Sequence, residues 1–245
     1  MKKQFCLFLF LSFLIMPLFS QTKDSASENA GSSDVTENQS ENNPFDRPFF
    51  EVTDFFVGFT PLLYISTESN YKGGPSNIAY PLYFGIAWPR NHWISIQPSL
   101  KFYTSYFLVN DGQVFPAEVE NRTGQGFSFL LNVPVVFKAN FWDKSNLKLS
   151  AGLAFLIRFA VAAPGVGDDD DGYFGSAKKD ISFMNKNFYE GAKFIYLSTS
   201  ADWMFNLNNG MQFGPELSFY IPVITLASEF SLYGTMISAG VKIFF

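Results

Sequence analysis

From residue 49 onward, hydrophobic and polar side chains alternate with a period of two along much of the chain. In 147–159 and 237–245, large apolar residues take every second position, and mostly small, polar or charged residues take the positions between. Successive side chains of a β-strand point to opposite faces, so the alternation predicts strands with one apolar and one more polar face. No run of 18 apolar residues occurs after residue 49, so no helical membrane span is predicted there.

Eight such segments predict an all-β fold, an eight-stranded antiparallel up-and-down transmembrane barrel. They cover about 50–66, 78–89, 92–108, 127–142, 147–162, 193–207, 211–224 and 231–245. Short turns are expected at 89–91, 143–146 and 208–210, and longer links at 67–77, 109–126, 163–192 and 225–230. This alternation of connection lengths is typical of bacterial outer-membrane barrels, which have short periplasmic turns and longer extracellular loops.

The facing of the strands distinguishes a membrane barrel from a soluble one. Small soluble barrels place apolar residues inside and polar residues outside. With that facing, this chain would expose Leu, Ile and Phe to water on every strand, so we expect the bulky apolar set to contact outer-membrane lipid. A soluble, lipocalin-like binding barrel of the periplasm requires the opposite facing and remains the alternative.

Ionisable residues belong to the inward phase of the strands. Three acids and three bases fall near the periplasmic ends: Asp54, Lys138, Lys148, Asp202, Glu216 and Lys242. Buried unpaired charge is costly, and eight strands enclose only enough room for side chains. We therefore predict a crossed ion-pair network that fills the lower lumen and leaves no open water pore. Lys101 and Arg158 are expected higher, lining an upper pocket.

The order of the strands also predicts which charges are neighbours. The first and last strands of a closed barrel are adjacent, as are strands four and five and strands six and seven. The expected contacts are Asp54 with Lys242, Lys138 with Lys148, and Asp202 with Glu216.

Tryptophan gathers near the predicted short turns, at Trp88, Trp93, Trp142 and Trp203. Indole rings favour the membrane interface, where an apolar body and a polar N–H are both satisfied. We expect these four residues to form a girdle at the periplasmic interface.

An acidic run lies in the longest predicted loop, at Asp168, Asp169, Asp170 and Asp171. Clustered oxygens on a loop can bind calcium, but the EF-hand spacing fails. With the EF-hand glycine aligned on Gly172, Gly167 takes the first ligand position and Lys178 the place of the last Glu. We expect a solvated surface loop and no metal site.

Two segments resemble a known family. Residues 238–245, SAGVKIFF, are similar to the C-terminal signal of outer-membrane barrels, and residues 131–138, LNVPVVFK, resemble the proline-containing strand of small barrels of the OmpX, OmpW and PorT-like kind. The resemblance covers about 49–245. It implies membrane placement and recognition of the strand ending in Phe245 by the barrel-assembly machinery, and it implies no specific activity.

The chain before residue 49 divides into two further segments. Residues 1–20 have the basic start and short apolar core of a signal peptide, and Cys6 lies in that core. Residues 21–48 are rich in Ser, Asn and Glu, which predicts a disordered acidic periplasmic tail. The barrel is expected over 49–245.

Composition narrows the function further. Only 16% of residues are charged and the net charge is −5, which argues against nucleic-acid binding. One Cys and one His exclude zinc sites built from those residues. His92 falls in a predicted periplasmic turn, where a neutral interfacial role is expected. We therefore predict neither an enzyme nor a cofactor.

Two membrane functions remain open. The first is a surface-exposed structural or interaction barrel, whose external loops meet an extracellular ligand or a host surface. The second, implied by the OmpW-type resemblance, is a narrow conduit for small hydrophobic molecules that leave sideways into lipid.

Overall fold

The computed structural model describes residues 49–65, 77–90, 92–142, 144–207, 210–227 and 234–245. The predicted signal peptide and acidic tail lie outside the described residues. Twelve strands form one sheet: β1 (Asp54–Phe59), β2 (Leu62–Tyr64), β3 (Asn77–Ala79), β4 (Leu82–Ala87), β5 (Ile94–Ile96), β6 (Ser99–Asn110), β7 (Gln113–Pro116), β8 (Gly124–Trp142), β9 (Ser145–Ala162), β10 (Ile195–Asn206), β11 (Gln212–Pro222) and β12 (Met236–Phe244). The helical elements are η4 (Phe49–Val52), α2 (Ala177–Asn187), η5 (Glu190–Ala192) and α3 (Val223–Ala227).

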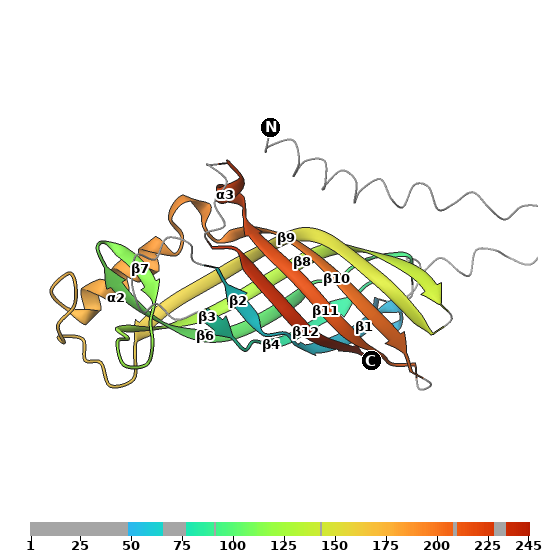
Figure 1. The fold of residues 1–245 in the computed structure, drawn as a ribbon, viewed down its shortest axis with the longest axis horizontal. Helices are drawn as coiled ribbons and strands as arrows, with labels where there is room; N and C mark the ends of the chain where they lie inside the picture. The colour runs from blue at the N-terminus through green and yellow to red at the C-terminus, as the bar shows by residue number, and fades with distance from the viewer. Residues whose placement is uncertain (1–48, 66–76, 91, 143, 208–209, 228–233) are drawn as a thin grey trace, which may run out of the picture. The chain divides into compact units, whose positions relative to one another are not determined.

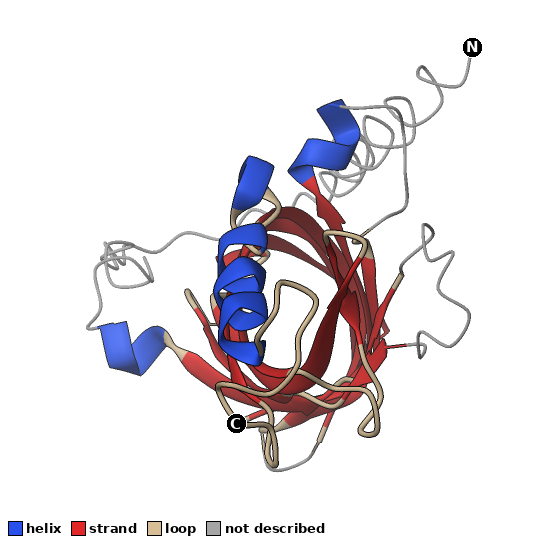
Figure 2. Ribbon diagram, turned by 90° about the vertical axis from the view of Figure 1, so that its left-hand side faces the viewer, coloured by secondary structure: helices blue, strands red, loops and turns tan. Residues whose placement is uncertain are grey.

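The sheet closes on itself. Strands follow the order β1-β4-β6-β8-β9-β10-β11-β12, and β12 returns to β1 through a ladder from Phe56↔Phe244 to Phe59↔Val241. Every pairing is antiparallel, and Figure 2 shows the strands as a ring. The predicted eight-stranded antiparallel barrel is therefore confirmed, with additional short strands at its rim.

Prolines divide the first three predicted strands. Pro61 separates β1 from β2, Pro81 lies between β3 and β4, and Pro98 lies between β5 and β6. Proline lacks the N–H that a ladder needs, so pairing stops and restarts on either side of it. Above the first break, β2 continues the wall by pairing with β12, as Met236↔Tyr64 shows.

The longer links contain structure that the sequence interpretation treated as loop. The link predicted over 109–126 holds β7, which forms a hairpin with β6, and the start of β8. The link predicted over 163–192 holds α2, which is a correction. Ala177, Met184 and Phe188 are buried at helical spacing, so the signal was present but masked by the surrounding polar residues.

The helix α2 packs on β9 at the end of the barrel away from the short turns (Figure 1), which we call the loop end. β9 runs beyond the start of β10, whose ladder begins at Ile195↔Phe155. There the Asn185 side chain accepts from the N–H of Ala160 at 2.8 Å and donates to its carbonyl at 3.0 Å. The Tyr189 hydroxyl accepts from Arg158 N at 3.1 Å and donates to Arg158 O at 2.7 Å. The side chains of Asn185 and Tyr189 thus form the hydrogen bonds to the β9 backbone that a neighbouring strand would otherwise form.

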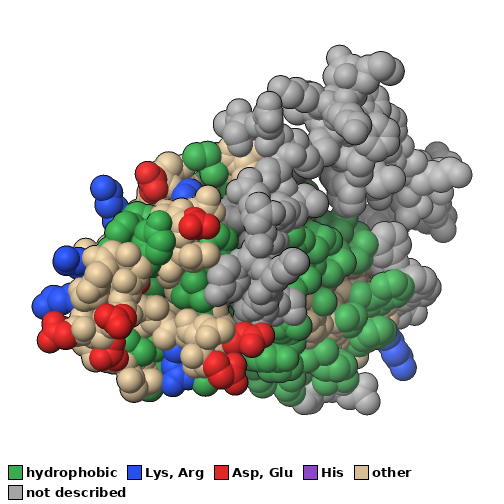
Figure 3. Space-filling view, turned by 60° about the vertical axis from the view of Figure 1, so that its left-hand side comes forward, with side chains coloured by type: hydrophobic (Ala, Val, Ile, Leu, Met, Phe, Trp, Pro, Cys, Tyr) green, Lys and Arg blue, Asp and Glu red, His purple; other side chains and the backbone are tan. Residues whose placement is uncertain are grey.

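The facing of the side chains is that of a membrane barrel. Leu153 on β9, Leu217 on β11 and Val241 on β12 are exposed, whereas Lys148 and Glu216 are 6% and 3% exposed. This is the reverse of a soluble barrel, so the lipocalin-like alternative is wrong. In Figure 3, hydrophobic side chains dominate the barrel flank, and charged ones gather over the loop end. No described helix is long and apolar enough to cross a membrane.

Candidate functional site

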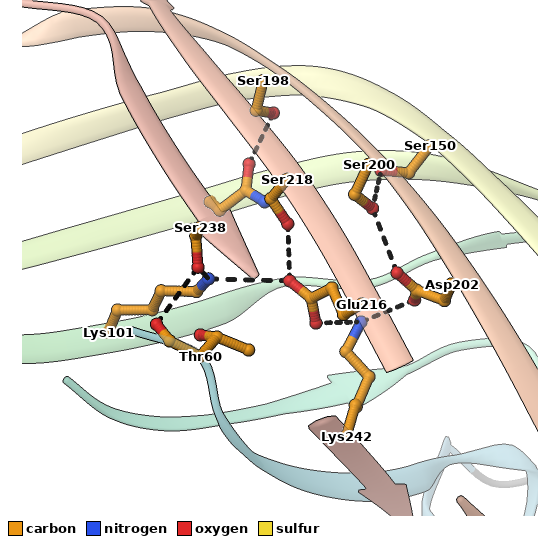
Figure 4. A network of polar contacts seen from close by, with 11 residues as sticks. Thr60, Lys101, Ser150, Ser198, Ser200, Asp202, Glu216, Ser218, Ser238 and Lys242 are labelled. Atoms are coloured by element: carbon orange, nitrogen blue, oxygen red, sulfur yellow. Dashed lines mark hydrogen bonds and ion pairs between the residues drawn. The ribbon is translucent and has the colours of Figure 1, made fainter. Parts of the chain in front are cut away.

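Four buried charges meet inside the lower barrel and form what we call the lumen ion network: Lys101 of β6, Asp202 of β10, Glu216 of β11 and Lys242 of β12 (Figure 4). Lys242 Nζ lies 2.7 Å from Asp202 Oδ2 and 3.0 Å from Glu216 Oε2. Lys101 Nζ lies 3.5 Å from Glu216 Oε1. Two acids and two bases cancel, and the side chains are between 1% and 4% exposed, so the charges compensate one another away from water.

Hydroxyl groups add hydrogen bonds to the network. Ser218 donates to Glu216 Oε1 at 2.6 Å, and Ser200 donates to Asp202 Oδ1 at 3.4 Å. Lys101 donates to the Ser238 hydroxyl at 3.0 Å, which in turn donates to the carbonyl of Thr60. A buried charged network is favourable only when its remaining donors and acceptors are occupied, and these small residues occupy several of them.

The position of Lys101 corrects the sequence interpretation, which placed it beside an upper pocket. It reaches across the lumen to Glu216 on the opposite wall, and its ammonium lies 4.4 Å from the centre of the Tyr83 ring. Strands of a closed barrel are tilted and staggered, so counting residues from a turn does not give equal heights on different strands.

Asp54 is also placed differently from the prediction. The β1–β12 register sets Gly58 opposite Lys242, and Asp54 lies further toward the short turns. Its partner is Arg90 in the turn after β4, with Arg90 Nε 3.1 Å from Asp54 Oδ1. The stagger of the closing ladder therefore removes Asp54 from the lumen ion network.

The other predicted neighbours are directly opposite one another in the ladders. Lys138 faces Lys148, and Asp202 faces Glu216, while Lys148 also faces Asp202 across the β9–β10 ladder. Lys148 Nζ donates to Gln212 Oε1 at 2.7 Å and lies 3.5 Å from the centre of the Phe244 ring. Lys138 is half-buried at the turn end. The structure thus brings three of the six predicted charges into the network, and the other three, Asp54, Lys138 and Lys148, border a small hollow at the turn end.

A hollow lies above the lumen ion network, and we call it the upper cavity. Its volume is about 480 Å³. Tyr103, Phe107 and Tyr196 line it from the barrel wall, and Phe188 lines it from the segment after α2. Arg158, predicted for an upper pocket, lines this cavity, and its guanidinium lies 4.5 Å from the centre of the Phe188 ring.

The barrel wall is interrupted beside the upper cavity. β4 pairs with β6 only from Leu82↔Phe102 to Gly85↔Ser99, and the described ladder of β3 is with β2 alone. Within the described strands, no ladder therefore joins 77–79 to 103–105, and we call this place the wall gap. Ile78 and Thr104, both exposed on the outer face, are among the residues that line the cavity, so the cavity borders the wall gap, across which β3 and β6 remain close.

The predicted girdle residues lie at the turn end. Trp93 and Trp203 are exposed on the outside of the barrel, and Trp88 is half-buried against Phe49. Trp142 ends β8, and its side chain lies outside the described residues.

The acidic run 168–171 lies between β9 and α2 and is exposed. Asp168 forms an exposed ion pair with Lys178 at 3.7 Å, and the Asp170 carboxylate accepts from the N–H of Gly167 at 2.7 Å. Sequence reasoning missed Asp180, which is buried and accepts from the N–H groups of Tyr173 and Phe174. Among the described residues, no group of three or more His, Cys, Asp or Glu is placed to hold a metal ion.

His92 lies in the turn after β4, with its Nδ1 3.1 Å from the carbonyl oxygen of Ile94. It borders a hollow of about 20 Å³ together with Asp54, Ser95 and Lys148. Such a volume holds about one water molecule, so this hollow is too small for a substrate.

No family model matches the sequence, and no curated protein matches it. Several solved structures are similar, including the following three. Neisserial surface protein A has 6% identity over 78% of this chain and 95% of its own, with a TM-score of 0.47. The outer membrane protein OprG from Pseudomonas aeruginosa has 6% identity over 79% and 95%, with a TM-score of 0.43. Ail, the attachment invasion locus protein of Yersinia pestis, has 11% identity over 79% and 97%, also with a TM-score of 0.43.

Proposed function

We propose that the protein is an integral β-barrel of a bacterial outer membrane, that its lumen is closed to ions, and that it acts through its loop end as a surface-exposed interaction barrel. The observation that carries the proposal is the pairing of an apolar outer face with a neutral set of buried charges inside. Lipid stabilises the apolar outer face, and water would not.

The lumen ion network supports a closed barrel. Its Lys101–Glu216 contact joins β6 to β11, which stand opposite each other in the ring of eight. The tyrosine and phenylalanine side chains of 56, 83 and 244 pack below it. Side chains that meet across the axis support a lumen without a continuous water path, and the proposal therefore includes no porin-like conductance. The proposal also includes no catalytic role.

Assembly belongs to the same proposal. The chain ends in Phe245, whose N–H donates to Phe55 O at 2.9 Å as β12 closes on β1. The barrel-assembly machinery is the expected partner for this closing strand, and outer-membrane lipid is the expected partner for the barrel flank.

The test is protease treatment of intact cells that express the full chain. We expect cleavage within 163–192, where Lys178, Lys179 and Lys186 offer trypsin sites, while the barrel stays protected and migrates differently on gels before and after heating. A chain protected in whole cells but fully digested after lysis would contradict surface exposure. A chain released in the soluble fraction would contradict the membrane barrel.

A conduit for small hydrophobic molecules is the second candidate, favoured by the upper cavity and the wall gap. The gap lies beside Thr104, which pairs with Phe127, and Phe127 pairs with the outward-facing Phe159, so the ladders connect the gap to outward aromatic residues. The test measures uptake of a radiolabelled alkane by cells. A lower uptake in Ala79→Trp, which narrows the gap, would favour this candidate. Uptake that is unchanged by Ala79→Trp would contradict it.

A further inference from the structure

The upper cavity has charge on one side and an opening on the other. Arg158 of β9 and Lys193, just before β10, both line it. They stand on neighbouring segments, because Leu156 N donates to Phe194 O at 2.8 Å beside the β9–β10 ladder. Two cations therefore share one wall of the cavity.

The opposite wall is apolar and contains the wall gap. β9 is the fifth strand of the ring counted from β1, so it faces β1 and its continuation β2 across the barrel. Leu62 and Tyr64 of β2 line that side, and Ile78 of β3 lines the adjoining gap. The cavity thus extends from the two cations to apolar residues beside the wall gap.

Two acids also border the cavity, Glu118 and Glu120. Both are exposed in the segment after β7, whereas Arg158 and Lys193 are half-buried. Charges that water screens act weakly at a distance, and partly buried charges act more strongly. Among the described residues that line the cavity, the two bases are more buried than the two acids.

Arg158 is contacted at its backbone and at its side chain. The Tyr189 hydroxyl bonds the backbone N–H and the backbone carbonyl of Arg158, and the guanidinium lies 4.5 Å from the centre of the Phe188 ring. A guanidinium that stacks on a ring matches the planar geometry of a carboxylate or phosphate. This arrangement of the Arg158 guanidinium favours recognition of an anionic group over simple hydration of the side chain.

We propose that the upper cavity binds a single-chain amphiphile with an anionic head, with the head on Arg158 and Lys193 and the alkyl chain directed to the wall gap. The volume of about 480 Å³ lies within the range of small-molecule sites. Tyrosine and phenylalanine along the path offer the apolar contact that an alkyl chain needs. This inference rests on the proposed function, because the chain end must meet lipid at the gap.

The test measures saturable binding to the full chain in lipid nanodiscs, with the signal of empty nanodiscs subtracted. Dodecanoate and dodecyl phosphate serve as the anionic probes and distinguish a fatty acid from a phosphate head. Dodecanol is the neutral probe of equal chain length. We expect at least one anion to bind roughly tenfold or more tightly than dodecanol, as a charge-assisted hydrogen bond implies.

Two variants test the assigned residues. Arg158→Gln with Lys193→Gln should weaken binding of the anion by roughly tenfold or more and leave dodecanol unchanged. Ser128→Trp, which fills the cavity from its buried wall, should remove binding of all three probes. Lys178→Gln is the matched control, because it removes an exposed cation that does not line the cavity.

Equal binding of dodecanol and both anions, or unchanged anion binding in the double variant, would overturn the inference. Absence of saturable binding by any probe would do the same. Each sample is checked for heat-dependent migration and for protease cleavage within 163–192. Lost binding in an inserted, surface-exposed barrel contradicts only this inference, whereas failure to insert contradicts the proposed function.

Discussion

Glu216 connects the two halves of the lumen ion network. It forms ion pairs with Lys101, which reaches across from β6, and with Lys242 on the neighbouring β12, and its Oε1 accepts a hydrogen bond from Ser218. A single side chain therefore neutralises charge from two directions in a place that water does not reach. Breaking such a buried pair is costly because the partners stay behind uncompensated.

We predict that Glu216→Gln lowers the free energy of unfolding by about 3 kcal/mol or more, because two buried lysines then share only Asp202. The measurement is urea unfolding of the full chain in phospholipid vesicles. Asp168→Asn is the matched control, since it removes an exposed acid whose pairing should count for less than about 0.5 kcal/mol. Equal stability of wild type and Glu216→Gln would show that the network does not hold the barrel.

The residues of this network were only partly predictable from the sequence. The period of two identified Asp202, Glu216 and Lys242 as inward-facing, because each has apolar neighbours along its strand. The same period could not identify Lys101 as their partner or Arg90 as the partner of Asp54. Those contacts depend on the stagger between strands, which is set when β12 closes on β1.

At the scale of elements, the main finding is how α2 completes β9. The upper part of β9 extends beyond β10, and an exposed strand edge can pair with another chain. Asn185 occupies both backbone groups of Ala160, and Met184 packs with Phe107 and Ala160. The helix therefore protects the edge and roofs part of the upper cavity. The alternation of side chains predicts the strands but not this helix, because a short helix between polar stretches gives a weak signal.

We predict that Asn185→Ala speeds hydrogen exchange at the amide of Ala160 by roughly tenfold or more, since that N–H loses its acceptor. The amide of Leu149, in the middle of the β9–β10 ladder, should keep its protection. Ser182→Ala, an exposed change on the same helix, is the control. Unchanged exchange at Ala160 would indicate that α2 does not seal the edge.

The outer face of the strands allows a further prediction. Leu153→Arg places a charge on the outward side of β9 and should destabilise the barrel in vesicles by about 2–4 kcal/mol, as charges facing lipid do. Ser182→Arg on the exposed face of α2 should leave stability within about 0.5 kcal/mol of wild type. Equal tolerance of the two substitutions would place Leu153 away from lipid.

At the scale of the whole molecule, the barrel could be predicted because one rule repeats on every strand. Alternating side chains, short and long connections and an apolar outer face all indicate the same closed architecture. The rim was less predictable, since the prolines that divide the strands carry no periodic signal. In the barrel, buried ion pairs fill the lower lumen, and the upper lumen contains a cavity.

The central claim is that the bulky apolar side chains face lipid while the ionised ones face one another. Its most direct test uses nitroxide labels on single cysteines at Leu153, Ile157 and Ser128 in the full chain in lipid, with Cys6, the sole cysteine, replaced by serine. We predict high collision rates with oxygen, which concentrates in lipid, and low rates with a water-soluble nickel chelate at Leu153 and Ile157. Ser128, which faces the upper cavity, should show low oxygen access. High nickel access with low oxygen access at Leu153 and Ile157 would contradict the account.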